Sequence, residues 1–298
     1  MFYSSSIDNY LRKSSTYQSR KGRIAKDTPL CIMKLSIKAR SYEMLLVLDI
    51  GNTNVTVGIF DGEELRATWR LETDVHRMPD EYAATLINLI SHAGIDLKEI
   101  DEAAICSSVP PLVTTFSEVC RRYFNTRPLV VAAGVRTGIK VLYDNPREVG
   151  ADRIADAVAA YRLYGGPVII VDYGTAMVFD AVSAEGEYLG GAIAPGIGVA
   201  VDALFERTAR LPRIEMVRPK SAIGRNTISS MQSGLILGYI GLVENLVQKF
   251  KEEIGPNAKV VATGGEAELL APQTSCIDLV NPDLTLIGLQ IIYELNRI

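Results

Sequence analysis

The order of apolar and polar positions predicts a β-hairpin early in the chain. An apolar run from Leu45 reaches Asp49, passes through the polar turn Gly51-Asn52-Thr53-Asn54, and resumes as a second apolar run from Val55 to Phe60. Two such runs on either side of a short glycine-containing turn are typical of a hairpin. Asparagine side chains often cap turns, so this segment alone fits a structural turn as well as a phosphate-binding one.

The same plan occurs a second time in Val168–Val182. An apolar run leads to Asp172, a turn follows at Gly174-Thr175, and a second apolar run completes the hairpin. Both hairpins continue into a Gly-Glu turn, Gly62-Glu63 in the first and Gly186-Glu187 in the second. The duplication predicts two related half-domains, residues 44–165 and 166–298, that present acidic, glycine-lined turns to a shared cleft.

The rest of the pattern alternates helices with buried strands. Apolar residues at helical spacing predict helices at 80–92, 112–124, 150–164, 199–208, 227–254 and 283–297. Short apolar runs predict strands that end near 71, and others at 103–107, 128–133 and 258–263. An antiparallel opening followed by this alternation indicates an α/β fold with mixed sheets.

Asp152 and Arg153 occupy the first turn of the helix that opens after Gly150-Ala151. A carboxylate at a helix N-terminus is commonly only a favourable interaction with the helix dipole. A carboxylate is also the usual base that takes a proton from a substrate hydroxyl in phosphoryl transfer. Both interpretations stay open on the sequence pattern.

Glycines mark three further segments. The run of glycines at 190–198 precedes a helix and suits close approach of the backbone to an anion, and Thr263-Gly264-Gly265 follows a buried strand. Gly234, Gly238 and Gly241 form a stripe on the longest predicted helix, which fits either a helix crossing within the chain or a dimer interface. GxxxxGK[ST] does not occur in the chain, which excludes a P-loop enzyme.

The composition is that of an ordinary globular protein. The chain has 298 residues, of which 48% are hydrophobic and 22% charged, with four cysteines at no metal-like spacing. These cysteines predict reduced thiols and a cytoplasmic protein. The two histidines, His76 and His92, lie in segments that make a histidine-dependent nucleophile or metal site unexpected. The longest apolar run, 235–243, is too short to cross a bilayer, so no membrane partner is expected.

Residues 1–43 differ from the rest. They carry nine lysines and arginines against three acidic residues and contain clusters of serine. We expect a disordered extension that comes from an upstream start, with true translation beginning at Met44; a transit peptide or a nucleic-acid-binding tail are the alternatives. The remaining chain is acidic, which argues against a nucleic-acid partner.

Several motifs together resemble one family, the type III pantothenate kinases of the acetate kinase, sugar kinase, Hsp70 and actin superfamily. They are Asp49-Ile50-Gly51-Asn52-Thr53, Gly150-Ala151-Asp152-Arg153, Asp172-Tyr173-Gly174-Thr175-Ala176, 190–196 and Gly224-Arg225-Asn226-Thr227. Tyr173 stands where this family more often has Phe. The resemblance implies duplicated ribonuclease H-like, actin-like ATPase half-domains, with mixed sheets flanked by helices and an ATP cleft between them.

The resemblance also implies roles for individual residues. The first motif would cradle the ATP phosphates, with Asp49 near Mg²⁺, and consists of Asp49, Ile50, Gly51, Asn52, Thr53, Asn54, Val55 and Thr56. Asp152 would be the catalytic base, Thr175 a nucleotide contact, and Asp172 the ligand of a monovalent cation, K⁺ or NH₄⁺. Contacts to pantothenate would come from Tyr143, Gly150, Ala151, Asp152, Arg153 and Thr227.

The function expected from the resemblance is ATP-dependent phosphorylation of pantothenate to 4'-phosphopantothenate by a homodimeric enzyme, in the first step of coenzyme A biosynthesis. Two alternatives are a sugar or acetate kinase of the same superfamily and a non-catalytic regulator that reuses the fold. A regulator would be expected to lack an acidic motif residue, whereas Asp49, Asp152 and Asp172 are all present.

Overall fold

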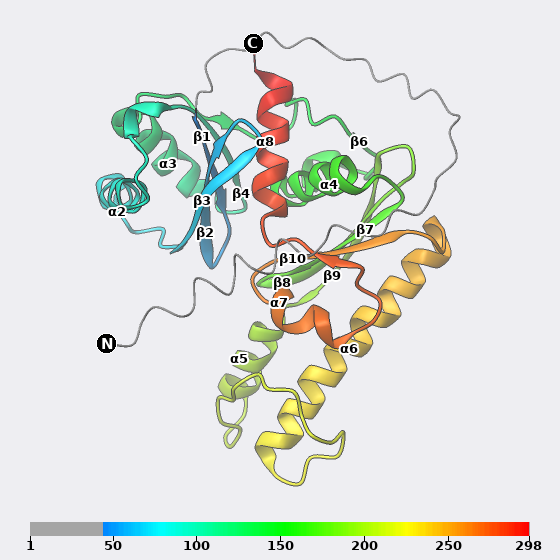
Figure 1. Ribbon diagram of the computed structural model, residues 1–298. Helices are drawn as coiled ribbons and strands as arrows, with labels where there is room; N and C mark the ends of the chain where they lie inside the picture. Colours follow the sequence, from blue (N-terminus) through cyan, green and yellow to red (C-terminus); the bar gives the residue numbers. More distant parts are fainter. Residues whose placement is uncertain (1–43, 298) are drawn as a thin grey trace, which may run out of the picture. The chain divides into compact units, whose positions relative to one another are not determined.

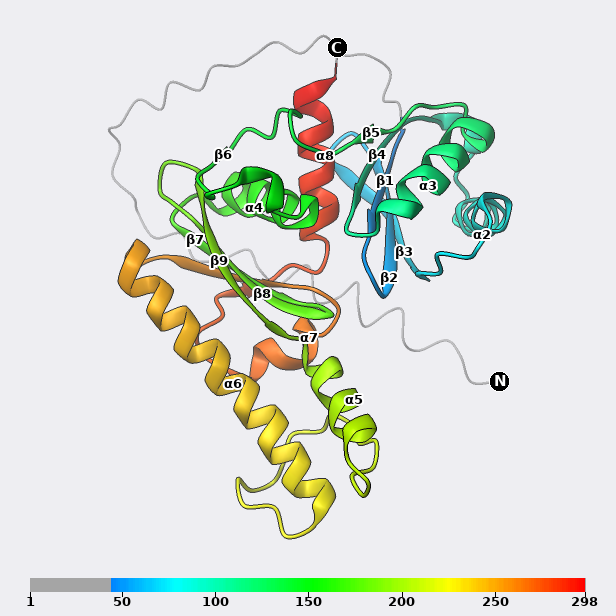
Figure 2. The ribbon, with the colours of Figure 1, turned by 180° about the vertical axis from the view of Figure 1, so that it is seen from behind.

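The computed structural model describes residues 44–297, and the expectations for residues 1–43 lie outside these described residues. The first sheet contains β1 (Met44–Ile50), β2 (Asn54–Asp61), β3 (Glu64–Glu72), β4 (Ile100–Ser107) and β5 (Leu129–Val130). Its strands lie in the order β3-β2-β1-β4-β5, and β1, β2 and β3 form an antiparallel meander. Strands β4 and β5 extend the other edge in parallel, so the sheet is mixed (Figure 1; β5 is labelled in Figure 2).

Alternate residues of β1 point to opposite faces of this sheet, and both faces are buried. Leu46, Leu48 and Ile50 pack under α2 (Pro79–His92) and α3 (Pro110–Tyr123). The other side chains, Leu45 and Val47 among them, belong to a separate core that reaches into the second half of the chain. The continuous apolar run of β1 from Met44 to Leu48 therefore follows from its two covered faces.

The second sheet repeats the order of the first. Its members are β6 (Lys140–Val141), β7 (Val168–Tyr173), β8 (Ala176–Val182), β9 (Glu187–Pro195), β10 (Lys259–Thr263) and β11 (Leu279–Val280). The order is β11-β10-β7-β8-β9-β6, with an antiparallel β7-β8-β9 meander and parallel β10 and β11 beyond β7. Only the short β6, paired in parallel with β9, has no counterpart among the described strands. This repetition confirms the predicted fold class of two related mixed sheets.

Helices α5 (Ile197–Arg207), α6 (Thr227–Ile254) and α7 (Ala267–Leu270) contribute to the core on one face of the second sheet. Ile169 and Val171 of β7 supply that face of the core. The three-residue 3₁₀ helices η1 (Leu97–Glu99), η2 (Pro146–Glu148) and η3 (Ala271–Gln273) lie in connections. Among the described residues, no helix combines the length and apolar character needed to cross a membrane.

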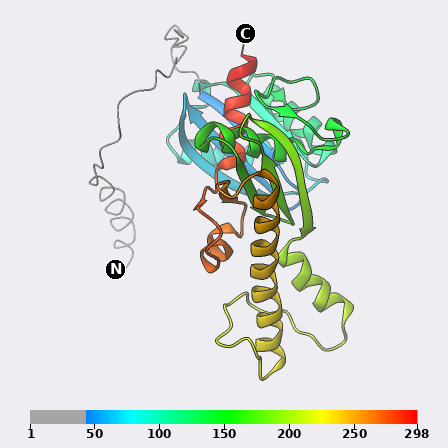
Figure 3. The same cartoon turned by 90° about the vertical axis from the view of Figure 1, so that its right-hand side faces the viewer.

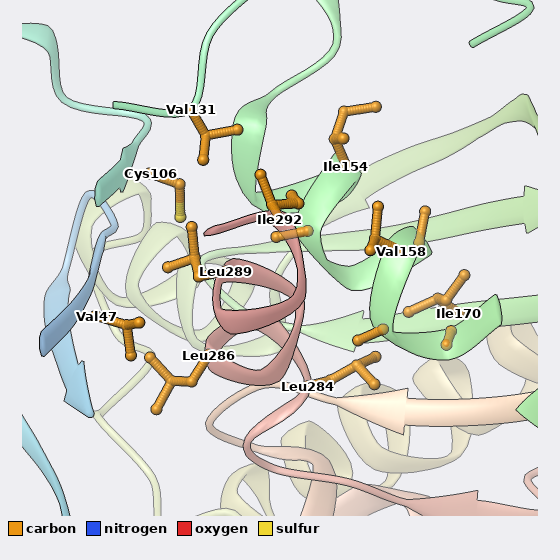
Figure 4. Packing of buried hydrophobic residues seen from close by; sticks show 14 of the residues in the cluster. Val47, Cys106, Val131, Ile154, Val158, Ile170, Leu284, Leu286, Leu289 and Ile292 are labelled. Carbon is orange, nitrogen blue, oxygen red and sulfur yellow. The ribbon is translucent and has the colours of Figure 1, made fainter. Parts of the chain in front are cut away.

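One helix from each half of the chain packs against the sheet of the other half. The last helix, α8 (Leu284–Asn296), packs against β1, β2 and β4 of the first sheet, while α4 (Ala151–Tyr164), which ends the first half, packs against β7 and β8 of the second. The two helices cross at Gly288, where an added Cβ would meet the backbone of Ala155. One apolar core surrounds the crossing (Figure 4). The predicted division at residues 165 and 166 stays a prediction, since the described residues 44–297 belong to one compact unit.

Candidate active site

Asp49 and Asp172 occupy the same position in the two sheets. Each is the penultimate residue of the central strand, β1 or β7, which continues into a polar turn. Asp49 lies opposite Cys106 of β4, and Asp172 lies opposite Thr263 of β10. The duplicated hairpin thus places one carboxylate at the equivalent end of each sheet.

The two hairpin turns touch each other. The hydroxyl oxygens of Thr53 and Thr175 are 2.7 Å apart, which joins a turn of the first sheet to a turn of the second. Within the first turn, the Gly51 amide donates to the carbonyl of Asn54 at 3.0 Å, and Thr73 Oγ1 donates to the Gly51 carbonyl at 2.7 Å. These contacts bring Asp49, Thr53 and Thr175 into one site.

The other residues of the first motif divide into exposed and buried positions. Asn52, Thr53 and Asn54 are exposed, so their side chains can reach a ligand. Ile50 and Val55 are fully buried in the sheet, so only their main-chain groups can do so. Thr56 is half-buried and lies opposite Asp49 across the strand pair, which puts it beside the carboxylate.

The N-terminus of α4 carries Asp152 and Arg153. Asp152 Oδ1 accepts a hydrogen bond from the Arg153 amide at 2.8 Å. Gly150 precedes the helix, and a Cβ there would collide with the Asp152 carboxylate. Ala151 is the first helical residue, so the motif Gly150–Arg153 forms one tight turn around the carboxylate.

Five carboxylates influence one another around this turn. Burial raises the pKa of both Asp49 and Asp172 to about 7, and the charge of Asp152 adds to the effect in each case. Burial also raises the pKa of Asp156 well above its usual range, and the nearby Asp172 adds to that effect. Asp180 is the fifth carboxylate of the group. Burial raises its pKa, and the charge of Asp152 adds to that effect. The site therefore has an excess of negative charge when its carboxylates ionise.

Two hydrogen bonds to the acidic cluster were not predicted. The Cys106 thiol donates to Asp49 Oδ1 at 3.1 Å, and its pKa lies well above the usual range because of burial and the adjacent Asp49 charge. Asp156 accepts a hydrogen bond at 2.7 Å from Thr285 of α8. Both contacts fix carboxylates of the site to neighbouring elements.

Arg153 is held on one edge by Asp180. Nη2 of Arg153 lies 2.6 Å from Asp180 Oδ1, and Nε donates to both Asp180 oxygens at 3.2 and 3.3 Å. The Tyr188 hydroxyl donates to Asp180 Oδ1 at 2.7 Å, and the Tyr143 ring lies 6.4 Å from the Tyr188 ring. Although burial opposes the charged form of Arg153, the hydrogen bonds and charge of Asp180 outweigh it and raise the arginine pKa. The predicted contact residues Tyr143 and Arg153 are thus brought together.

Asp180, Tyr188 and Asp156 were not predicted as site residues. The sequence does contain a signal for Asp180, because this residue interrupts the otherwise apolar β8 segment AMVFDAV. In the structure Asp180 is only 2% exposed. Asp156 follows Asp152 by four positions, which places both on one face of α4. Charged residues inside an apolar strand or on an apolar helix face are costly unless they are paired, which makes them candidates for a site.

Thr227 does not join the carboxylates within one chain. The middle of α6 is tied to the second sheet by Tyr239, whose hydroxyl donates to Pro195 O at 2.8 Å. Thr227 is the first residue of this helix, about 18 Å further along its axis at 1.5 Å per residue. In Figures 1 to 3 that end of α6 extends away from the sheets. Thr227 instead lines an open groove of about 780 Å³ with Leu204, Leu211, Gly224, Arg225, Met231 and Leu235.

The donor set suits cations that arrive with a ligand better than a protein-built metal centre. Among residues 44–297, no three His, Cys, Asp or Glu side chains are placed to hold a metal ion. Mg²⁺ commonly binds through one or two carboxylates together with substrate phosphates, and Asp49 is available for that arrangement. A monovalent cation near Asp172 would offset the charge of a carboxylate whose neighbours Asp49 and Asp152 are also acidic.

Comparisons with known proteins agree with one another. A family model described as type III pantothenate kinase matches residues 45–249. A type III pantothenate kinase from Dehalococcoides mccartyi strain CBDB1 is 54% identical over 261 residues, covering 88% of this chain and 99% of the relative. One from Roseiflexus sp. strain RS-1 is 55% identical over 254 residues, 85% of this chain and 100% of the relative.

A solved structure resembles the fold at much lower sequence identity. It is a Baf family transcriptional activator from Campylobacter jejuni, with a TM-score of 0.54, 20% identity, and coverage of 84% of this chain and 98% of that chain. At this identity the likeness shows the fold alone. The match of the family model and the identity to full-length relatives show that the chain belongs to the type III pantothenate kinase family.

Proposed function

We propose that this protein transfers the γ-phosphoryl group of ATP to the primary hydroxyl of pantothenate, giving 4'-phosphopantothenate in the first step of coenzyme A biosynthesis. The observation that carries the proposal is the position of Asp152 at the N-terminus of α4, within electrostatic reach of the paired turn carboxylates Asp49 and Asp172. A candidate base therefore lies beside two acidic, glycine-lined turns, as a hydroxyl kinase requires.

Asp152 accepts the proton of the pantothenate hydroxyl as that oxygen attacks the γ-phosphorus. The new P–O bond forms while the bond between the γ-phosphorus and the β,γ-bridging oxygen breaks, and ADP leaves with that electron pair. Phosphoryl transfer follows a loose path in which the hydroxyl proton is lost late, so a carboxylate such as Asp152 can serve as the base. Its hydrogen bond from the Arg153 amide fixes the orientation of the carboxylate.

The two hairpin turns hold the phosphates. The exposed side chains of Asn52, Thr53 and Asn54 and the hydroxyl of Thr175 supply donors, and Ile50, Gly51, Val55 and Thr56 supply main-chain groups or shape the turn. The 2.7 Å contact between Thr53 and Thr175 joins the two turns, which supports one phosphate site shared by both sheets. Mg²⁺ near Asp49, and K⁺ or NH₄⁺ near Asp172, neutralise charge when bound.

We place pantothenate beside Asp152, next to α4 and β9. Gly150, Ala151 and Arg153 surround the base, and the Tyr143 ring lies close to Gly190 of β9. Thr227 is also proposed as a substrate contact, by family resemblance alone. These assignments divide the site into a nucleotide side on the turns and an acceptor side on α4 and β9.

The test is a coupled ADP-release assay on the purified full-length protein with ATP, Mg²⁺ and K⁺. Turnover is compared for pantothenate, glucose, glycerol and acetate, and then with Na⁺ as the sole monovalent cation. We expect turnover with pantothenate alone and loss of most activity in Na⁺. Turnover with a sugar or acetate instead would support another kinase of the superfamily, and folded protein inactive on all four acceptors would support a regulator.

The role of Asp152 is tested separately with Asp152→Asn. We expect this variant to keep ATP binding and lose most turnover, because the amide cannot accept the proton. Asp61→Asn is the matched control, since within residues 44–297 the Asp61 carboxylate makes its one ion pair with the exposed Arg66. Wild-type turnover in Asp152→Asn would remove Asp152 from the role of base.

We also propose that the enzyme is a cytoplasmic homodimer. The thiols Cys106, Cys120 and Cys276 are free, which suits a reducing compartment. Near the start of α6, Ile223 is 79% exposed and Ile228 is 50% exposed, and a second copy of the chain would cover such apolar side chains. Light scattering across protein concentrations should give twice the chain mass, and a monomer throughout would contradict the proposal.

A further inference from the structure

Asp180 is a buried carboxylate that has no role in the proposed mechanism. Its side chain is 3% exposed and accepts hydrogen bonds from Arg153 Nε, Arg153 Nη2 and the Tyr188 hydroxyl. These bonds use one edge of the guanidinium. Among residues 44–297, no protein atom accepts a hydrogen bond from Arg153 Nη1, so the second edge is available to a ligand.

The arginine side chain is constrained from several directions. Its side chain is 12% exposed, and its guanidinium carbon lies 5.8 Å from the centre of the Tyr188 ring. Its backbone is in the first turn of α4, beside Asp152. A guanidinium fixed in this way presents a planar pair of donors, which matches the geometry of a carboxylate.

A structural role alone does not account well for this pair. Apolar residues of the same volume often stabilise a core as much as a buried ion pair does, or more. The pair between Arg153 and Asp180 therefore has its clearest use in fixing where the free edge of the guanidinium points. The acceptor substrate of the proposed reaction carries one carboxylate at the end opposite the hydroxyl that is phosphorylated.

We propose that Asp180, assisted by the Tyr188 hydroxyl, is a positioning residue that orients Arg153 to bind the carboxylate of the acceptor substrate. This inference rests on the proposed function. Asp180 does not touch the substrate, and it acts only through Arg153. The arrangement selects an acidic acceptor over a neutral one of the same shape.

The experiment compares pantothenate with pantothenol, in which an alcohol replaces the carboxylate, as substrate or as competing inhibitor. In Asp180→Asn we expect KM for pantothenate to rise about 10- to 100-fold, the range of a charge-assisted hydrogen bond. KM for ATP and the affinity for pantothenol should stay within about twofold. Asp61→Asn is the matched control and should change none of these values.

A double-mutant cycle tests whether Asp180 acts through Arg153. KM for pantothenate in Asp180→Asn with Arg153→Gln should equal that of Arg153→Gln alone, because no oriented guanidinium remains. Tyr188→Phe removes one hydrogen bond to Asp180 and leaves the ion pair with Arg153 in place. We expect it to raise KM for pantothenate several-fold. This variant also tests the inference if Asp180→Asn does not fold.

Three results would overturn the inference. They are an unchanged KM for pantothenate in the foldable variants, equal losses for pantothenate and pantothenol, and additive effects in the double variant. Failure of the proposed function is recognised separately, because the wild-type protein would then not phosphorylate pantothenate at all.

Discussion

The crossing of α4 and α8 at Gly288 allows a prediction whose sign follows from geometry. In Gly288→Ala the new Cβ would meet the carbonyl group of Ala155 and would lie 2.9 Å from its Cα. The obstacle is helix backbone, which cannot rotate away as a side chain can, so the helices must separate. The neighbouring buried side chains Leu284 and Leu289 would then lose packing.

Overpacking a well-filled core destabilises a protein by about 1–3 kcal/mol. The upper end applies at Gly288 because the collision is with backbone, and the better helix propensity of alanine offsets about 1 kcal/mol of it. We therefore expect Gly288→Ala to lower the free energy of unfolding by about 2 kcal/mol. Urea unfolding at one protein concentration, followed by circular dichroism, measures the change.

Gly238→Ala is the matched control. It makes the same substitution inside a helix, but apart from the adjoining backbone of α6 itself no described atom lies within 4 Å of the added Cβ. We expect it to leave stability unchanged or to raise it by about 0.5–1 kcal/mol, because alanine is the better helix former. A Gly288→Ala protein as stable as the wild type would refute the assigned closeness of the two helices.

Three further outcomes are expected. Tyr173→Phe should raise the free energy of unfolding by about 1 kcal/mol in thermal or urea unfolding, because the buried Tyr173 hydroxyl has no hydrogen-bond partner in the described chain; destabilisation would imply a partner. Stability of the ligand-free protein should fall as the pH rises from about 4 to about 7, because Asp49 and Asp172 titrate near 7 when folded but near 3.8 when unfolded, and the folded state therefore binds more protons in that window. Urea unfolding at several pH values measures how steeply the stability falls. The fall should be shallower in Asp49→Asn than in the wild type, and an equally steep fall would contradict the assigned burial of Asp49. Leu286→Ala, which removes a buried side chain of α8, should destabilise by about 2–5 kcal/mol, and a loss below 1 kcal/mol would place α8 outside the core.

The sequence was sufficient for the two hairpins, for the long helices and for the duplication, but it did not predict β6, β9, β11 or α7. Apolar runs on both sides of Asp49 and Asp172 predicted the two hairpins, and helical spacing predicted α4 and α6 to within a few residues. These features are local, because strand and helix periodicities are visible in neighbouring residues. The turn residues Thr53 and Thr175 were expected at a shared cleft, and the structure brings them into contact.

Features that depend on distant packing could not be predicted. The apolar face of α8 is visible in the sequence, but nothing local shows that β1 and β2 lie under it. The same limit applies to Asp180 of β8, whose partner Arg153 lies 27 residues earlier in α4. Thr227 shares a motif with its neighbours, yet its distance from the carboxylates follows from the direction of α6.

The packing of α8 and α4 across the two halves has a consequence for how the protein is made. A chain leaving the ribosome presents the first sheet well before α8, which ends at Asn296 and covers one face of β1 and β2. Until α8 emerges, Val47 and Phe60 have no complete core. The first half therefore cannot reach its final stability before α8 is made, and a ribosome that stops short of Leu284 releases a chain with an exposed apolar sheet, the kind of surface that chaperones bind.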